Sequence, residues 1–410
     1  MPCILLRAVS LTAAWLPALA LAAPLTLEQA LDLAVQRSES THAARAGAAS
    51  ASESARAAGQ LPDPTLQAGI DNLPVTGAGA FRTTSDSMTM KRIGIAQEWL
   101  SSQKRAMRRT ASEAVAARED AQVRTAVADT RVQTALAYVD AFYAMEALKL
   151  TARMAHHAHE ELEASQARLS SATGSSQDVL ALAVARGMAE DESDDAGQRQ
   201  GEAAVALERW IGMAVDELAP PVVASPPTEA DFVAHLPSLV ALRRDVDVAR
   251  QAAAVAASER TPNWTWQVSY GQRAGYADMV SVGVSIPLQV APAQRQDRQT
   301  ASRLALVEKA EADLAEATRA ASSDYASLLG DVQRLQQRIA RYQANVAMPA
   351  QQRIATATAS YASNQASLAT LFEARHAQVD AERKVLALRR DLARATVQLA
   401  FKPLTTGGAQ

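Results

Sequence analysis

Two pairs of strand-like segments interrupt a chain that otherwise reads as alanine-rich helix. The pairs follow Pro62 and Pro262, and after Pro262 apolar and polar residues alternate through 264–270 and again through 280–289. Alternation with a period of two gives a strand one apolar and one polar face. A run of about ten such residues is also long enough to cross a bilayer at a tilt. These segments therefore predict amphipathic strands suited to a membrane.

The chain contains an internal repeat. Thr65-Leu66-Gln67 matches Thr265-Trp266-Gln267, and the segment 108–112 matches 298–302. Self-similarity of this kind marks one structural unit used twice. The predicted boundaries are a first repeat over 24–218, a linker over 219–232 and a second repeat over 233–402. Prolines at 220, 221, 226 and 227 exclude a helix interior in the linker.

The N-terminus has the pattern of a signal peptide. Arg7 is followed by an uncharged apolar run that ends in small residues, so we expect residues 1–23 to be removed on export. An uncleaved membrane anchor is the alternative. The only cysteine, Cys3, lies inside this segment, so we expect an exported chain with no disulfide and no lipid on a cysteine. Residues 403–410 are expected to form a flexible tail.

The first pair of strands is less regular than the second. Leu66, Ala68 and Ile70 alternate in the same way, but Lys91 and Arg92 interrupt the apolar pattern of the strand expected over 88–97. For one strand alone, an ordinary hairpin with a solvated face explains the alternation. Four such strands in a repeated context, behind an export signal, favour a sheet that crosses a membrane.

The helical segments carry a coiled-coil pattern. Leu136, Tyr143 and Leu150 form a weak seven-residue series in the first repeat. A continuous helix over 104–168 would extend about 100 Å at 1.5 Å per residue, which predicts a span between two distant places. A stronger a/d seam, with spacings of four and three, runs through Ala321, Tyr325, Leu328, Val332, Leu335, Ile339, Tyr342 and Val346.

Four amphipathic strands cannot stand alone in a membrane. They leave two open edges, whose unpaired backbone groups cannot face lipid. Single-chain barrels start at about eight strands, so we expect several chains to share one barrel. A lumen wide enough for transport favours three chains over two, with about twelve strands. The sequence therefore predicts a homotrimer whose long helices continue the tube into the periplasm.

The chain resembles the TolC-like outer membrane factor family in the order of its helices and strands. The resemblance extends over nearly its whole exported length. The stretches LPDPTLQAGIDNLPVTG and DSMTMKRIGIAQEW resemble its heavy-metal branch, the CzcC-type components of tripartite cation pumps. The resemblance implies a mainly α fold with a membrane β-barrel, built on a duplicated helix–strand–strand–helix plan. Four strands per chain would enter a shared trimeric barrel, continued by a long α-helical coiled-coil tunnel.

The same resemblance implies a location and partners. The barrel would lie in outer membrane lipid, with the helical domain in the periplasm. The partners would be a periplasmic adaptor (membrane fusion protein) and an inner membrane pump of the RND class.

The two turns between long helices are candidate docking sites. The resemblance implies that Arg168-Leu169-Ser170 and Tyr361-Ala362-Ser363 contact the adaptor. The family usually has glycine where this chain has Ala172 and Asn364, because a tight turn needs a left-handed residue. Asparagine replaces glycine well, whereas Ala172 is a departure, and Gly174 offers an alternative position for the turn. A plain solvated turn is the other interpretation.

Acidic residues near these turns are candidates for the periplasmic aperture. Asp178 and Glu373 occupy positions where the family often has carboxylates, and three copies of each would form a cation-attracting ring. Charge on an exposed helix surface explains them equally well. The acidic run 190–195 samples all sides of a helix, as solvated segments do.

We expect no catalytic site, no cofactor and no resident metal. Of His156, His157 and His159, only the first and third share a helix face, and no further ligand completes a site. Met88 and Met90 share a strand face, where packing or lipid contact explains them better than soft-metal binding. The sequence shows no nucleophile triad, phosphate loop or carboxylate pair. A net charge of -3 gives nucleic-acid binding no support.

We therefore expect the outer membrane channel of a tripartite RND efflux system, which passively exports heavy-metal cations. Export of drugs or organic solutes is the alternative within the family, because the pump selects the cargo. A periplasmic coiled-coil strut without a pore has no use for four bilayer-length strands. An exported hydrolase is a further alternative, but it would need a catalytic site, and the sequence shows none.

Overall fold

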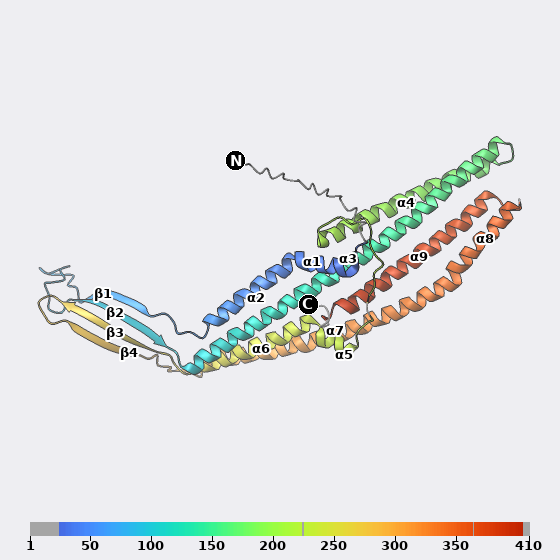
Figure 1. Cartoon of the computed structure of the whole chain (residues 1–410). Helices are drawn as coiled ribbons and strands as arrows, with labels where there is room; N and C mark the ends of the chain where they lie inside the picture. The colour runs from blue at the N-terminus through green and yellow to red at the C-terminus, as the bar shows by residue number, and fades with distance from the viewer. Residues whose placement is uncertain (1–23, 224, 364, 405–410) are drawn as a thin grey trace, which may run out of the picture.

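The computed structural model describes residues 24–223, 225–363 and 365–404. The molecule is elongated: a small sheet lies at one end, and helices run from it to two tips at the other (Figure 1). The predicted signal peptide, 1–23, lies outside the described residues, as does most of the predicted tail. Within the described ranges, no helix is both long enough and apolar enough to cross a membrane.

The order of elements is similar in the two halves of the chain. The first half consists of α1 Leu27–Arg37, α2 Glu39–Ala57, β1 Thr65–Asp71, β2 Met90–Trp99, α3 Ser102–Ser170 and α4 Ser176–Ile211. The second consists of α5 Glu229–His235, α6 Pro237–Ser258, β3 Trp264–Arg273, β4 Met279–Ser285, α7 Gln296–Tyr342, the π-helical turn η1 Gln343–Ala347, α8 Met348–Ala362 and α9 Leu368–Phe401. Thr26 and Gln29 form a capping box that begins α1.

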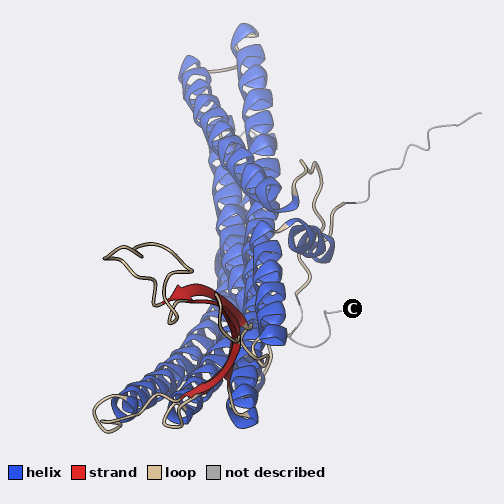
Figure 2. Cartoon of the chain, turned by 90° about the vertical axis from the view of Figure 1, so that its left-hand side faces the viewer, coloured by secondary structure: helices blue, strands red, loops and turns tan. Residues whose placement is uncertain are grey.

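The four strands form one antiparallel sheet in the order β1-β2-β3-β4. β2 and β3 pair along their whole length, from Met90 opposite Arg273 to Trp99 opposite Trp264, and so join the two halves of the chain. β1 and β4 are the two edges of this sheet within the described chain. Seen from its own end of the molecule, the sheet is curved (Figure 2).

The predicted alternation gives the sheet two different faces. One row of the register places Leu66, Ile95, Val268 and Val282 side by side, and these side chains are between 40% and 74% exposed. The next row, on the opposite face, is small and polar: Gln67, Gly94, Ser269 and Ser281. The sheet therefore has an apolar face that its own chain leaves uncovered.

Two strand boundaries expected from the alternation are wrong. The strand expected over 280–289 ends at Ser285, because Pro287 has no N–H to donate. The Gln289 side chain instead donates to the Glu259 carbonyl oxygen, at 2.8 Å.

The strand expected over 88–97 is Met90–Trp99. Met88 lies before β2, so it does not share a strand face with Met90. Lys91 lies opposite Ile70 near the far end of the strand, and Arg92 on the other face is 3.4 Å from Asp71. These positions explain how the strand accommodates both cations.

The predicted long helix is confirmed in α3, which has 69 residues and extends about 100 Å. It packs against α2, α4, α6 and α9, and therefore forms the spine of the bundle. Small side chains such as Ala121 and Ala135 are completely buried along it, which lets the neighbouring helices approach closely.

The predicted seam of the second half is confirmed along α7 but not beyond it. Its residues Ala321, Tyr325, Leu328, Val332 and Ile339 are buried, and Leu335 and Tyr342 are partly buried. Val346 is exposed because it lies in η1. Pro349 cannot donate to a preceding carbonyl, and the chain widens into a π-turn just before it. One extra residue per turn rotates the following side chains by about 100°.

Two tyrosines hold irregular segments, before α1 and between the two halves, against the long helices. The Tyr138 hydroxyl, from a fully buried side chain of α3, lies 2.6 Å from the Leu25 carbonyl oxygen and 2.7 Å from that of Ala219. Burial raises the pKa of Tyr138 to about 12, against a smaller lowering by the Ala219 hydrogen bond. Tyr325 of α7 donates in the same way to the Pro227 carbonyl oxygen, at 2.9 Å.

Candidate functional sites in the helical bundle

The first tip joins α3 to α4. α3 ends at Ser170, and Ala172 adopts a left-handed conformation with a φ of 58°. The Ala172 N–H donates to the Leu169 carbonyl and the Thr173 N–H to the Arg168 carbonyl, both at 3.0 Å. These bonds satisfy carbonyl groups in the last turn of the helix. Of the two positions expected for the left-handed residue, the chain uses Ala172.

Gly174 serves the same turn through close packing. A Cβ at this position would lie 2.8 Å from the backbone nitrogen of Leu169 and 2.9 Å from the carbonyl carbon of Arg168. Backbone atoms at the end of a helix cannot easily move aside, so only glycine fits. Ser175 then caps α4 by accepting a hydrogen bond from the Gln177 N–H, at 3.1 Å.

Replacing Ala172 with glycine is expected to stabilise the first tip. A left-handed alanine costs about 1–2 kcal/mol, and glycine removes this cost apart from its own loss of backbone entropy. We expect amide hydrogen exchange at residues 171–173 to slow several-fold. Ala167→Gly, at an exposed position with helical backbone, is the matched control and should speed exchange. Faster exchange in Ala172→Gly would contradict the assigned strain.

The second tip joins α8 to α9. α8 ends at Ala362, and the Gln365 N–H donates to the Ser360 carbonyl at 2.8 Å. Ser367 caps α9 by accepting a hydrogen bond from the Thr370 N–H, at 3.2 Å. The expected left-handed residue of this turn, Asn364, lies outside the described residues.

The two tips touch each other. Arg168 donates to the Tyr361 hydroxyl at 2.8 Å, and its guanidinium lies 5.3 Å from the centre of the Tyr361 ring. The other docking candidates, Leu169, Ser170, Ala362 and Ser363, are exposed around this contact. The structure thus brings both candidate tripeptides together at one end of the molecule.

The two candidate aperture residues lie on different helices. Asp178 is half-buried in the first turn of α4, whereas Glu373 is exposed on α9. Glu373 lines a cavity of about 230 Å³ between α3, α4 and α9, together with Met188 and His376. Among the described residues, no hydrogen bond or ion pair joins Asp178 to Glu373.

Below the tips, Glu161 of α3 is buried inside the bundle. One carboxylate oxygen accepts a hydrogen bond from Arg375 of α9, while the other, Oε2, has no hydrogen-bond partner in the described part of the chain. Burial raises the pKa of Glu161, although Arg375 acts in the opposite direction. The folded protein therefore disfavours the charged form of this carboxyl.

Replacing Glu161 with glutamine is expected to raise the free energy of unfolding at pH 7. A raised folded-state pKa means that the contribution of Glu161 to stability is present below its unfolded pKa, about 4.3, and lost as pH rises through the folded value. Glutamine stays neutral and still accepts from Arg375. The advantage of Glu161→Gln should therefore vanish near pH 4, as measured by urea unfolding in detergent. A less stable variant at pH 7 would show that the Arg375 attraction outweighs burial.

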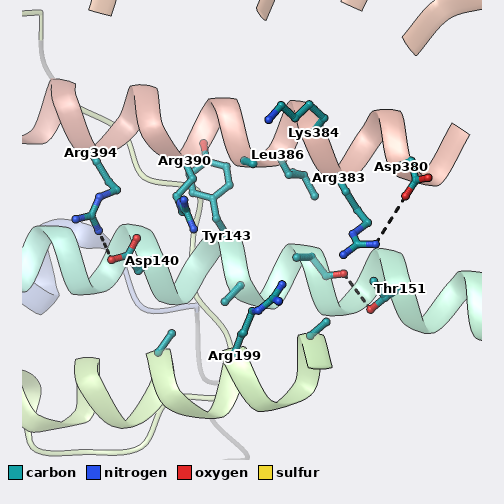
Figure 3. A pocket seen from close by; sticks show the side chains of 15 residues that line it. Asp140, Tyr143, Thr151, Arg199, Asp380, Arg383, Lys384, Leu386, Arg390 and Arg394 are labelled. Atoms are coloured by element: carbon teal, nitrogen blue, oxygen red, sulfur yellow. Dashed lines mark hydrogen bonds and ion pairs between the residues drawn. The ribbon is translucent and has the colours of Figure 1, made fainter. Parts of the chain in front are cut away.

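A groove of about 830 Å³ lies between α3, α4 and α9 (Figure 3). Small residues of α3, such as Ala144 and Ala147, leave the space, and α9 lines it with Arg383, Lys384, Arg390 and Arg394. Arg394 pairs with Asp140 across the groove. Lys384 makes no ion pair within the described chain. The sequence alone does not reveal this groove, because its charges come from separate helices.

The histidines of α3 are engaged with neighbouring carboxylates. His156 and His157 lie 3.3 and 3.2 Å from Glu160, and His159 lies 3.3 Å from Glu163. Among the residues that the structure describes, no group of three or more His, Cys, Asp or Glu side chains could hold a metal ion.

Solved structures of outer membrane channels share this fold. The outer membrane protein VceC from Vibrio cholerae matches with a TM-score of 0.70 and 19% identity, over 90% of this chain and 95% of that one. The open-state MtrE outer membrane channel of Neisseria gonorrhoeae matches with a TM-score of 0.76 and 15% identity, over 92% and 88%. CusC, described in terms of transmembrane channel formation, matches with a TM-score of 0.75 and 12% identity, over 92% and 91%.

No protein-family model matches the sequence, and a search of curated proteins finds no match. The structural likeness nevertheless spans about nine-tenths of the chain. The protein therefore has the fold of outer membrane channel proteins, with four strands at one end and two helical tips at the other.

Proposed function

We propose that the protein is the outer membrane channel of a tripartite RND efflux system, with its helical bundle in the periplasm. One observation carries the proposal: among the described residues, the sheet has an uncovered apolar face and two unpaired edges, and long helices lead away from one end of it. The fold shared with VceC, MtrE and CusC supports it. The proposed role is passive conduction, without catalysis.

Aromatic residues at the ends of the strands support contact with lipid. Trp99 and Trp264 lie opposite each other at the junction with the helices, with ring centroids 6.0 Å apart. Phe81 and Tyr276 are exposed in the loops beyond the other end. Membrane barrels carry such aromatic residues on both sides of their apolar band.

Three chains would close the sheet. Pairing β1 of one copy with β4 of the next would give a barrel of about twelve strands without open edges. In this proposal the repeats 24–218 and 233–402, joined by the linker 219–232, each contribute one hairpin. The tips, Arg168–Ser170 and Tyr361–Ser363, would contact a periplasmic adaptor that connects the channel to the inner membrane RND pump.

Heavy-metal cations are the proposed cargo. The resemblance of the stretches around β1 and β2 to the CzcC-type branch supports this assignment. Carboxylates of Asp178 and Glu373, present three times in a trimer, would attract cations at the periplasmic aperture. Export of organic solutes is the alternative outcome of the test.

The test measures both the oligomeric state of the protein and the substrate that it exports. Deleting the gene in its native host is expected to sensitise cells to divalent metal salts, and the intact gene should restore resistance. Protein purified from the outer membrane in mild detergent should have the mass of three chains by light scattering. Sensitivity to organic solutes alone would assign the alternative cargo. A stable monomer, or protein in the soluble periplasmic fraction, would contradict the channel.

A further inference from the structure

Lys91 places a positive charge on the apolar face of the sheet. It belongs to the same row of β2 as Ile93 and Ile95, and the register places it between Ile70 of β1 and Gln272 of β3. Its side chain is exposed. Within the strands that the structure describes, every other residue on this face is uncharged. A charge in this position needs a physical explanation, because the rest of the face is suited to lipid.

Lys91 makes no ion pair within the described chain, although carboxylates lie at the same end of the sheet. Asp71 is on the opposite face, 3.4 Å from Arg92. Asp278 accepts a hydrogen bond from the Tyr270 hydroxyl. Strand β1 separates Lys91 from the open edge, and β4, which would lie across that edge in the proposed barrel, contains no acidic residue. The counterion of Lys91 therefore lies outside the protein chain.

Lys91 lies near the end of the apolar face that is farthest from the helices. It is eight positions before Trp99 in β2, which corresponds to about 27 Å along an extended strand. With a strand tilt of about 40°, this is about 20 Å across a membrane, against an apolar band about 25 Å tall. The loops that join β1 to β2 and β3 to β4 lie just beyond (Figure 1). The ammonium group can therefore reach the lipid headgroups while its stem lies along the apolar face.

Gln272 supplies a second hydrogen-bond donor beside Lys91. The two residues are direct partners across β2 and β3, and side chains paired in this way have Cβ atoms about 5 Å apart. Gln272 is exposed, and its amide makes no hydrogen bond within the described residues. An ammonium group and an amide N–H at this spacing can donate to the oxygens of one phosphate group.

We propose that Lys91 and Gln272 bind a phosphate group of lipopolysaccharide in the outer leaflet of the outer membrane. Acyl chains of the same molecule would lie along exposed apolar side chains of this face, such as Ile93 and Val268. The inference rests on the proposed channel, because a helical bundle in the periplasm leaves the far end of the sheet at the cell exterior. The outer leaflet presents phosphorylated glycolipid at that level.

Lipid binding to protein purified from outer membranes tests the site. Native mass spectrometry of the trimer in mild detergent is expected to show one molecule of diphosphoryl lipid A, the phosphorylated anchor of lipopolysaccharide, bound per copy. Lys91→Met should raise the apparent dissociation constant about tenfold, because it removes a charge-assisted hydrogen bond. Gln272→Ala should raise it several-fold. Lys91→Arg should retain binding, since a guanidinium group also binds phosphate.

Arg92→Met is the matched control. Arg92 is the next residue along β2, so this change removes the same charge from the opposite face, and lipid A binding should be unchanged. Methionine at position 91 fits a lipid-facing surface better than lysine does. The trimer of Lys91→Met should therefore form at least as well as that of the unchanged protein, which separates a loss of binding from a loss of folding.

Three further ligands identify the source of the phosphate. Lipid A without its phosphate groups should bind more weakly, and equally to the unchanged protein and to Lys91→Met. Inorganic phosphate should not displace lipid A, because it has no acyl chains to contact the apolar face. Phosphatidylglycerol, with one phosphate and fewer acyl chains, should also bind more weakly. Equally tight binding of phosphatidylglycerol, with the same dependence on Lys91, would overturn the assignment to lipopolysaccharide.

The outcomes separate this site from the proposed channel. A trimer that binds lipid A equally well with and without the Lys91→Met change would overturn the site and leave the channel intact. Equal losses in Lys91→Met and Arg92→Met would also overturn it, because net charge rather than the apolar face would then attract the lipid. A monomer, or protein recovered from the soluble periplasmic fraction, would overturn both proposals.

Discussion

Changing Arg168 to aspartate is expected to abolish efflux while leaving the trimer at its normal level in the outer membrane. Arg168 holds the two tips together through the hydroxyl and the ring of Tyr361. An aspartate loses the cation–π contact and replaces hydrogen-bond donors with acceptors on the proposed adaptor surface. Ser170→Glu, which adds negative charge to the same exposed turn, is expected to have the same effect.

Two controls separate docking from stability. Arg153→Asp makes the same charge change at an exposed position of α3 away from the tip, and should leave efflux normal. Tyr361→Phe removes only the hydroxyl and keeps the ring, so it should retain most of the activity. The measurement is resistance in a host with the cognate pump and adaptor, with trimer level checked in parallel. Normal resistance in both tip variants would show that docking does not depend on this turn.

Replacing Lys104 with methionine is expected to lower the free energy of unfolding by about 3 kcal/mol. The Lys104 ammonium is buried where β2 meets α3, and it lies 2.9 Å from both Glu259 Oε2 and Asn263 Oδ1. These contacts join that junction to the one between α6 and β3. Methionine fills a similar volume but leaves Glu259 without its buried cation. Because about a third of Glu259 is exposed, we expect a loss at the lower end of the range for buried pairs.

Arg108→Met is the matched control, because Arg108 binds the same carboxylate, at 3.1 Å, from a much more exposed position. Its loss should be below about 1 kcal/mol. Partial burial raises the pKa of Glu259, but hydrogen bonds from Lys104 and Arg108 lower it further, so the folded pKa is depressed. The stabilisation is therefore present above the unfolded pKa and lost as pH falls through the folded value. Equal losses for the two variants across this range, by urea unfolding in detergent, would contradict the assignment.

Side-chain periodicity was sufficient to predict that the strands and the long helices exist, although two strand boundaries were wrong. Period two placed Val268 and Val282 on one face, and spacings of four and three placed Tyr325 and Val332 in a buried seam, because both patterns are local. Val346 was wrongly included in that seam, because Pro349, which interrupts the helical pattern just beyond it, was not taken into account.

Contacts between distant parts of the chain could not be predicted in this way. Arg168 and Tyr361 are 193 residues apart, and each alone reads as an exposed turn residue. Lys104 reads as an ordinary lysine in the first turn of a helix, and it becomes buried only because two strand–helix junctions converge on it. The charges of the groove beside α9 likewise come from helices that only the fold places together.

The pairing of β2 with β3 also sets the order in which the molecule can be completed. Trp99 is opposite Trp264, so the centre of the sheet cannot form until the whole α3–α4 hairpin and the following segment have been synthesised. Contacts of such long sequence separation form slowly, whereas helical hairpins made of nearer residues form early. The edges of β2 and β3 that later pair with each other therefore stay open while the helices assemble, and during this interval the chain is most vulnerable to aggregation.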